Sequence, residues 1–97
     1  MKALNKLDLN SDLLKAEEIL KNNGCTEMYL FGSVIEGKAG EHSDIDIAVK
    51  GIPKNKFFCI YGKILSQLKH PVDLICLDYS NEFTDFLINS GGLKRVF

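Results

Sequence analysis

The sequence predicts an α/β (α+β) fold, in which a small sheet is covered by helices in one layer or two. Segments with apolar residues at the helical period alternate along the chain with short apolar runs, the order expected when helices and strands share one core. The length of 97 residues and the hydrophobic fraction of 45% suit a single core. No linker or internal repeat interrupts this order, so we expect one domain over residues 1–97.

A first helix is expected to begin at Asn10 or Ser11, because both residue types cap helix N-termini. It is expected to end before Gly24, a residue type that suits the position just past a helix. The apolar residues that recur near the helical period and are expected to face the core are Leu13, Leu14, Ile19 and Leu20.

Three strands are expected. Residues 26–32, TEMYLFG, are short, aromatic and apolar, and they run into a turn at Gly32-Ser33. Residues 43–51, SDIDIAVKG, alternate between apolar and polar side chains. Residues 71–78, PVDLICLD, form the third predicted strand.

Two further helices complete the predicted order of elements. The first covers residues 53–70, where apolar side chains follow the helical period. The second has Asn81 as a cap, Glu82 in its first turn and Gly91-Gly92 at its end. The residues of these two helices that are expected to face the core are Phe57, Phe58, Ile60, Tyr61, Ile64, Leu65, Leu68, Phe83, Phe86 and Leu87.

Charge and cysteine content narrow the classes of function. The net charge of −1 gives no general attraction to nucleic acid or to anionic lipid. Cys25, Cys59 and Cys76 form an odd set without a C-x-x-C pair, which indicates three small core residues rather than disulfides or a zinc site. No apolar stretch reaches the length of a signal peptide or a membrane span, so a reducing cytoplasm is expected.

Two aspartates interrupt the second predicted strand. Side chains alternate faces along a strand, so Asp44 and Asp46 share the face opposite Ile45 and Ile47, about 6 to 7 Å apart. Two carboxylates this close repel each other unless a cation neutralises them, and Mg²⁺ prefers such oxygen ligands. Asp73 interrupts the third strand in the same way and would join a shared metal site if the two strands are neighbours, an adjacency that the sequence leaves open.

Gly32-Ser33 supplies a possible anion site beside these carboxylates. A glycine at a turn after a strand lets the backbone approach a phosphate closely, and Ser33 can offer a hydroxyl and N–H groups. Each feature alone has a plainer interpretation, because a lone D-x-D is more often an exposed strand face and Gly-Ser more often a turn. His42 and His70 stand beside turns, where solvated loop histidines are expected.

Taken together, these residues carry a resemblance to a known family. Gly32-Ser33, ten intervening residues, Asp44-Ile45-Asp46 and the later Asp73 resemble the signature of the DNA polymerase β-like nucleotidyltransferase superfamily. The segments LFGSVIEG and SDIDIAV are similar to the minimal nucleotidyltransferases, which are often the antitoxin partners of HEPN-domain toxins. The resemblance covers residues 25–92 and implies a mixed sheet flanked by helices.

The resemblance also implies the chemistry of the site. Asp44 and Asp46 would bind two Mg²⁺ ions, and Asp73 would bind the second ion and act as general base for the incoming hydroxyl. Gly32 and Ser33 would hold the phosphates of ATP, with Ser43 as a further nucleotide-binding residue, and pyrophosphate would be released.

One departure from the resemblance concerns the loop after Gly32-Ser33. Relatives commonly carry arginines there, whereas this chain has Val34 and Glu36, with Gly37 retained. A triphosphate would lose positive charge at this point. Lys38 and Lys50 are the candidate replacements.

The resemblance implies transfer of AMP from ATP to a hydroxyl, typically of a tyrosine, on a HEPN-type toxin encoded next door, which neutralises the toxin. We expect these 97 residues to leave no room for an appended domain that would hold a small acceptor, which favours an acceptor that brings its own binding surface. Two alternatives stay open at this stage: an antitoxin that acts by binding alone, and a transferase for a small molecule or an RNA end. The oligomeric state and the nucleotide preference also stay open.

Overall fold

Four strands form one mixed sheet in the order β3-β2-β1-β4. The computed structural model describes residues 6–32, 45–78 and 82–97. Strand β1 (Glu27–Phe31) pairs in antiparallel fashion with β2 (Ile45–Lys50) on one side and with the short β4 (Lys94–Arg95) on the other. Strand β2 pairs in parallel with β3 (Val72–Cys76). The mixed sheet implied by the resemblance is therefore confirmed.

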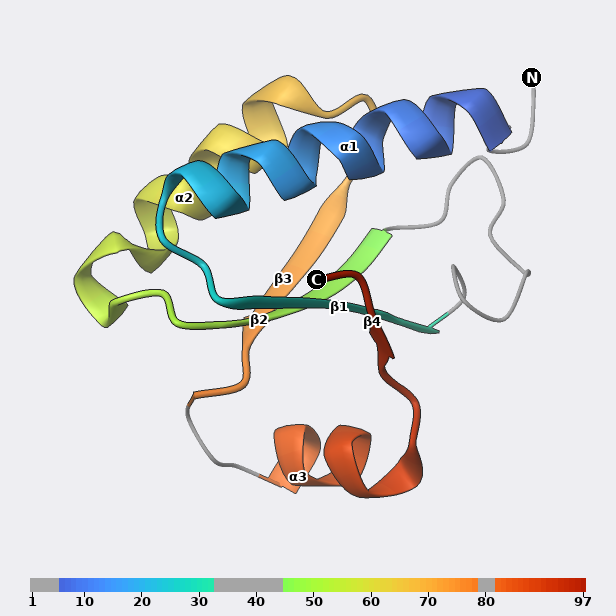
Figure 1. Ribbon diagram of the computed structural model, residues 1–97, viewed down its shortest axis with the longest axis vertical. Coiled ribbons are helices and arrows are strands. Elements are labelled where there is room, and N and C mark those ends of the chain that lie inside the picture. The colour runs from blue at the N-terminus through green and yellow to red at the C-terminus, as the bar shows by residue number, and fades with distance from the viewer. Residues whose placement is uncertain (1–5, 33–44, 79–81) are drawn as a thin grey trace.

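The helices lie on both faces of this sheet (Figure 1). Helices α1 (Lys6–Asn22) and α2 (Lys54–Gln67) cover one face, and α3 (Glu82–Ser90) lies on the other. Helix α2 makes the crossover between the parallel strands β2 and β3, because parallel neighbours cannot be joined by a tight hairpin. The predicted order of elements is confirmed from α1 to α3, with helices on both faces of the sheet.

Most of the core lies between the sheet and the pair α1 and α2. The strand residues Ile45, Ile47 and Val49 are fully buried on this face. A smaller cluster on the other face packs α3 against the sheet through Leu87, Ala48 and Phe31. The face of β2 that carries Asp46 is therefore the face that α3 partly covers.

Helix α1 ends as predicted but begins earlier. Gly24 has a φ of +88°, its N–H donates to the carbonyl of Lys21, and the N–H of Cys25 donates to the carbonyl of Leu20. This pair of hydrogen bonds is the Schellman arrangement that a left-handed glycine permits. The helix is already formed at Lys6, so the predicted start at Asn10 or Ser11 is wrong.

Several residues that were expected in the core are exposed instead. Leu14 is 67% exposed and Phe58 is 81% exposed. The other exposed residues that were expected inside are Cys59, Leu65 and Phe86. Strand β4 was not predicted, since two exposed residues carry no alternating pattern. In the part of the chain that the structure describes, no helix has the length and apolar character needed to cross a membrane.

Candidate active site at one edge of the sheet

Three of the predicted site residues, Gly32, Asp46 and Asp73, lie where three strands meet at one edge of the sheet. Strand β1 runs opposite to β2 and β3, so its C-terminal end lies beside their N-terminal ends. Phe31 pairs with Asp46, and Asp46 pairs with Asp73. Phe31, Asp46 and Asp73 therefore form one row across the sheet, and Gly32 follows Phe31 directly, next to this row.

Asp46 and Asp73 project from the same face of the sheet. They are direct partners in the parallel register, and partners in register point to the same side. Their backbones are one strand spacing apart, about 4.8 Å. Asp46 is half-buried and Asp73 is exposed, while Ile45 and Val72 anchor the two strands in the core on the other face. The adjacency that the sequence left open is present.

Gly32 lies directly against the carboxylate of Asp46. Its φ is +73°, a left-handed conformation that glycine adopts without strain. A Cβ atom at this position would overlap the Oδ2 atom of Asp46. The absence of a side chain therefore serves both the turn and the close approach of backbone to carboxylate.

Several predicted site residues lie outside the described residues. These are Ser33, Val34, Glu36, Gly37, Lys38, His42, Ser43 and Asp44. Within the described ranges, no group of three or more His, Cys, Asp or Glu side chains is placed to hold a metal ion. The two carboxylates that the structure brings together, Asp46 and Asp73, offer the hard oxygen donors that suit Mg²⁺.

Lys50 lies too far along β2 to replace the missing arginines. It stands four residues after Asp46, about 13 Å along the strand at about 3.3 Å per residue. Its partner in the register is Glu27, at the opposite end of β1 from Gly32. Close to Lys50, Tyr29 donates a hydrogen bond to Glu27, which raises the pKa of Tyr29 and lowers that of Glu27. This group belongs to the far end of the sheet.

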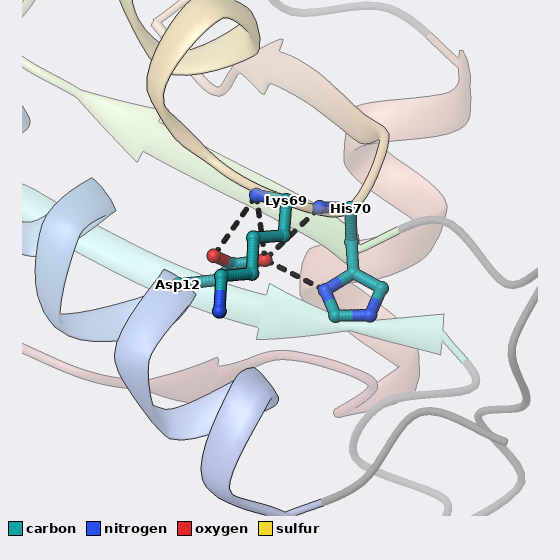
Figure 2. Close-up of polar contacts among 3 residues, drawn as sticks. All are labelled: Asp12, Lys69 and His70. Atoms are coloured by element: carbon teal, nitrogen blue, oxygen red, sulfur yellow. Dashed lines mark hydrogen bonds and ion pairs between the residues drawn. The ribbon is translucent and has the colours of Figure 1, made fainter. Parts of the chain in front are cut away.

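Asp12 is a buried charged residue that the sequence reasoning missed. Figure 2 shows its carboxylate facing the backbone of Lys69 and His70, just before β3. His70 Nδ1 lies 2.7 Å from Asp12 Oδ2, and the His70 side chain is only 14% exposed, so the expectation of a solvated loop histidine is wrong. Burial alone would raise the pKa of Asp12, but the hydrogen bonds from Lys69 and His70 hold this pKa below its ordinary value.

A sequence signal for Asp12 did exist. Asp12 stands four residues before Ala16 and eight before Leu20, both fully buried, so it occupies the inward face of α1. An acidic residue at such a position indicates a buried partner, which the sequence does not identify.

Comparison with known families and structures gives three kinds of result. A profile of the family described as "Polymerase beta, Nucleotidyltransferase" matches residues 14–93. Comparison with curated proteins finds no match. Among solved structures, a chain of a toxin–antitoxin complex with AMP-PNP superposes with a TM-score of 0.71 at 26% identity, covering 90% of this chain and 71% of that chain.

Two other solved complexes are similar to a comparable extent. A chain of a mutant of the toxin–antitoxin MntA–HpeT superposes with a TM-score of 0.70 at 28% identity, covering 88% of this chain and 71% of that chain. A chain of the tri-AMPylated Shewanella oneidensis HEPN toxin in complex with MNT antitoxin superposes with a TM-score of 0.67 at 25% identity, covering 91% and 71%.

Proposed function

This chain belongs to the polymerase beta nucleotidyltransferase family, and we propose that it transfers AMP from ATP to a hydroxyl of a partner protein, a HEPN-type toxin. The modification neutralises the toxin, so the chain acts as an antitoxin. The observation that carries this proposal is the pairing of Asp46 with Asp73 in register, with Gly32 directly against the Asp46 carboxylate. Two carboxylates in register beside a glycine, whose backbone carries no side chain of its own, suit a metal-bound phosphate.

The proposed roles follow the family resemblance. Asp44, Asp46 and Asp73 would hold Mg²⁺, Gly32 and Ser33 would bind the phosphates of ATP, and Ser43 would be a further nucleotide-binding residue. When bound, two Mg²⁺ ions supply the positive charge that polarises the α-phosphate and neutralises the departing pyrophosphate. Asp73 accepts the proton of the acceptor hydroxyl, whose oxygen bonds to the α-phosphorus as the bond to the β-phosphate oxygen breaks.

The choice of substrate and partner rests on the similar structures. One is a toxin–antitoxin complex with AMP-PNP, an ATP analogue, and another contains a HEPN toxin that carries AMP. We therefore assign ATP as the nucleotide and a HEPN-type toxin, encoded next door, as the protein that brings the acceptor. All three cysteines are free thiols, which suits a reaction in the reducing cytoplasm.

The proposal is tested by incubating the purified chain with Mg²⁺, ATP and the product of the neighbouring gene, followed by intact-mass measurement. The expected result is the addition of one or more AMP units to the partner. Asp46→Asn should abolish the addition, and Glu18→Gln should preserve it, since Glu18 is an exposed acid on α1. An unmodified partner in the presence of folded wild-type chain contradicts the proposal.

A second candidate is an antitoxin that acts by binding alone. The observation that favours it is the presence of Val34 and Glu36 where relatives carry arginines. In that case the complex forms equally well with Asp46→Asn, and no AMP appears on the partner. A transferase for a small molecule or an RNA end would instead transfer label from ATP in the absence of the partner.

A further inference from the structure

We infer that Asp12 is a positioning residue of the active site, which fixes the start of β3 and thereby holds Asp73 in register with Asp46. This inference rests on the proposed function, in which Asp73 accepts the proton of the acceptor. Asp12 itself belongs to α1, on the face of the sheet opposite the two catalytic carboxylates. Its effect on the reaction is therefore exerted through the backbone.

The contacts of Asp12 converge on two consecutive residues. The N–H of Lys69 lies 3.0 Å from Oδ1 and 3.1 Å from Oδ2 of Asp12, and the N–H of His70 lies 3.0 Å from Oδ2. His70 Nδ1 adds a further contact of 2.7 Å (Figure 2). The Asp12 side chain is 2% exposed, so water does not compete for these donors. One carboxylate thus binds two consecutive residues that lie 57 and 58 positions further along the chain.

Three elements fix the segment between His70 and Asp73. The carbonyl of Pro71 accepts a hydrogen bond of 2.8 Å from the N–H of Ile45 in β2. The carbonyl of Val72 accepts a bond of 2.7 Å from the hydroxyl of Tyr61 in α2. Asp12 in α1 binds Lys69 and His70, which come just before this segment. The residues that lead into Asp73 are therefore hydrogen-bonded to α1, α2 and β2.

The position of the residues before Asp73 matters because Asp73 is the second residue of β3. A shift of the register by one residue would turn the Asp73 side chain to the opposite face of the sheet, away from Asp46. A purely apolar contact at position 12 would bury surface equally well, but it has no preferred direction. Hydrogen bonds from two backbone N–H groups fix both the distance and the orientation of the segment.

The test compares Asp12→Asn and Asp12→Ala with Glu18→Gln, which removes an exposed charge from the same helix. The full chain is used with its partner protein, and folding of each variant is verified by circular dichroism. We expect kcat for AMP transfer to fall about 10- to 100-fold in both Asp12 variants, with the larger loss in Asp12→Ala, as displacement of a catalytic group predicts. At saturating Mg²⁺ the KM for ATP should change by less than about twofold, since Asp12 does not contact the nucleotide in this scheme.

Amide hydrogen exchange and Mn²⁺ binding give readouts that do not depend on turnover. Exchange at residues 69–74 should accelerate in the Asp12 variants, and Mn²⁺ alone, followed by electron paramagnetic resonance, should bind more weakly because the two carboxylates are less well aligned. Tyr61→Phe, which removes the hydroxyl bond to Val72, should reproduce both effects. It also serves as the second variant if Asp12→Ala does not fold.

A folded Asp12→Asn chain with the wild-type kcat overturns the positioning role, even if its stability is reduced, and leaves the proposed function intact. If the wild-type chain transfers no AMP, the proposed function fails. The positioning role of Asp12 is then tested by hydrogen exchange and Mn²⁺ binding alone. Exchange rates and Mn²⁺ affinities equal to those of wild type in the Asp12 variants would contradict it.

Discussion

Gly32 shows how a single residue can determine the geometry of the site. Its left-handed φ and the carboxylate of Asp46 leave no room for a Cβ atom. The sequence predicted the turn and the role of a glycine in it, because Gly-Ser after a strand is a local pattern. The sequence placed Gly32 near the carboxylates, but the direct contact with Asp46 depends on the antiparallel pairing of β1 and β2, which no local pattern shows.

Gly32→Ala should abolish AMP transfer, since the new methyl group would displace the Asp46 carboxylate. The backbone strain should also reduce the free energy of unfolding by about 1 to 2 kcal/mol. Gly24→Ala is the matched control, because Gly24 also has a positive φ but nothing within 4 Å of its Cβ position. Urea unfolding should show a similar decrease in the free energy of unfolding for both variants. A transfer assay should show that only Gly32→Ala loses activity. Full activity of Gly32→Ala would contradict the close approach.

Asp12 should make stability depend on pH in the acid range. Its pKa in the folded state is lowered, so its contribution to stability is complete above the ordinary value of 3.8 and is lost as the pH falls from there through the lowered value. At pH 7, Asp12→Asn should lower the free energy of unfolding by about 1.5 to 3 kcal/mol, the range for hydrogen bonds to a charged group. Urea unfolding between pH 7 and pH 3 should show that the difference in the free energy of unfolding between wild type and Asp12→Asn decreases below about pH 4. A difference that stays constant over this range would contradict the assignment.

At the scale of elements, the sequence pattern predicted the three helices and the first three strands, but it did not always predict which side of an element is buried. Helix α2 has the expected length within a few residues, with Ile60 and Ile64 buried as predicted. Its apolar residues cover more than one face, so periodicity alone did not separate the inward Ile64 from the outward Phe58. Which side of α2 faces the sheet is decided by the crossover between β2 and β3 and by packing against α1.

Substitutions on the two sides of α2 should therefore have very different effects. Ile64→Ala removes a fully buried side chain and should lower the free energy of unfolding by about 2 to 5 kcal/mol. Phe58→Ala removes a larger side chain that is 81% exposed, and it should change the free energy of unfolding by only about 0.5 kcal/mol. Thermal or urea unfolding of the two variants measures the difference. Equal losses would mean that the orientation of α2 is wrong.

At the scale of the whole molecule, local patterns predicted the fold class and the residue types of the site, while only the family resemblance implied that these residues form one site. Alternating elements, the aspartate pattern and the Gly-Ser turn are local features, and family membership agrees with them. The pairing of Asp46 with Asp73 requires that β3 lies parallel to β2 rather than elsewhere in the sheet. The link from Asp12 to His70 spans 58 residues and leaves no local pattern. Both depend on strand order and helix packing, which are properties of the complete fold.

The central claim is that Asp46 and Asp73 act together in transferring AMP to the partner protein. The most direct measurement is the initial rate at which AMP appears on the partner, by intact mass, for wild type, Asp46→Asn, Asp73→Asn and the double variant. Residues that act as one unit are not additive, so we expect both single variants to lose transfer and the double variant to lose no more. Transfer at the wild-type rate in either folded single variant would contradict the account.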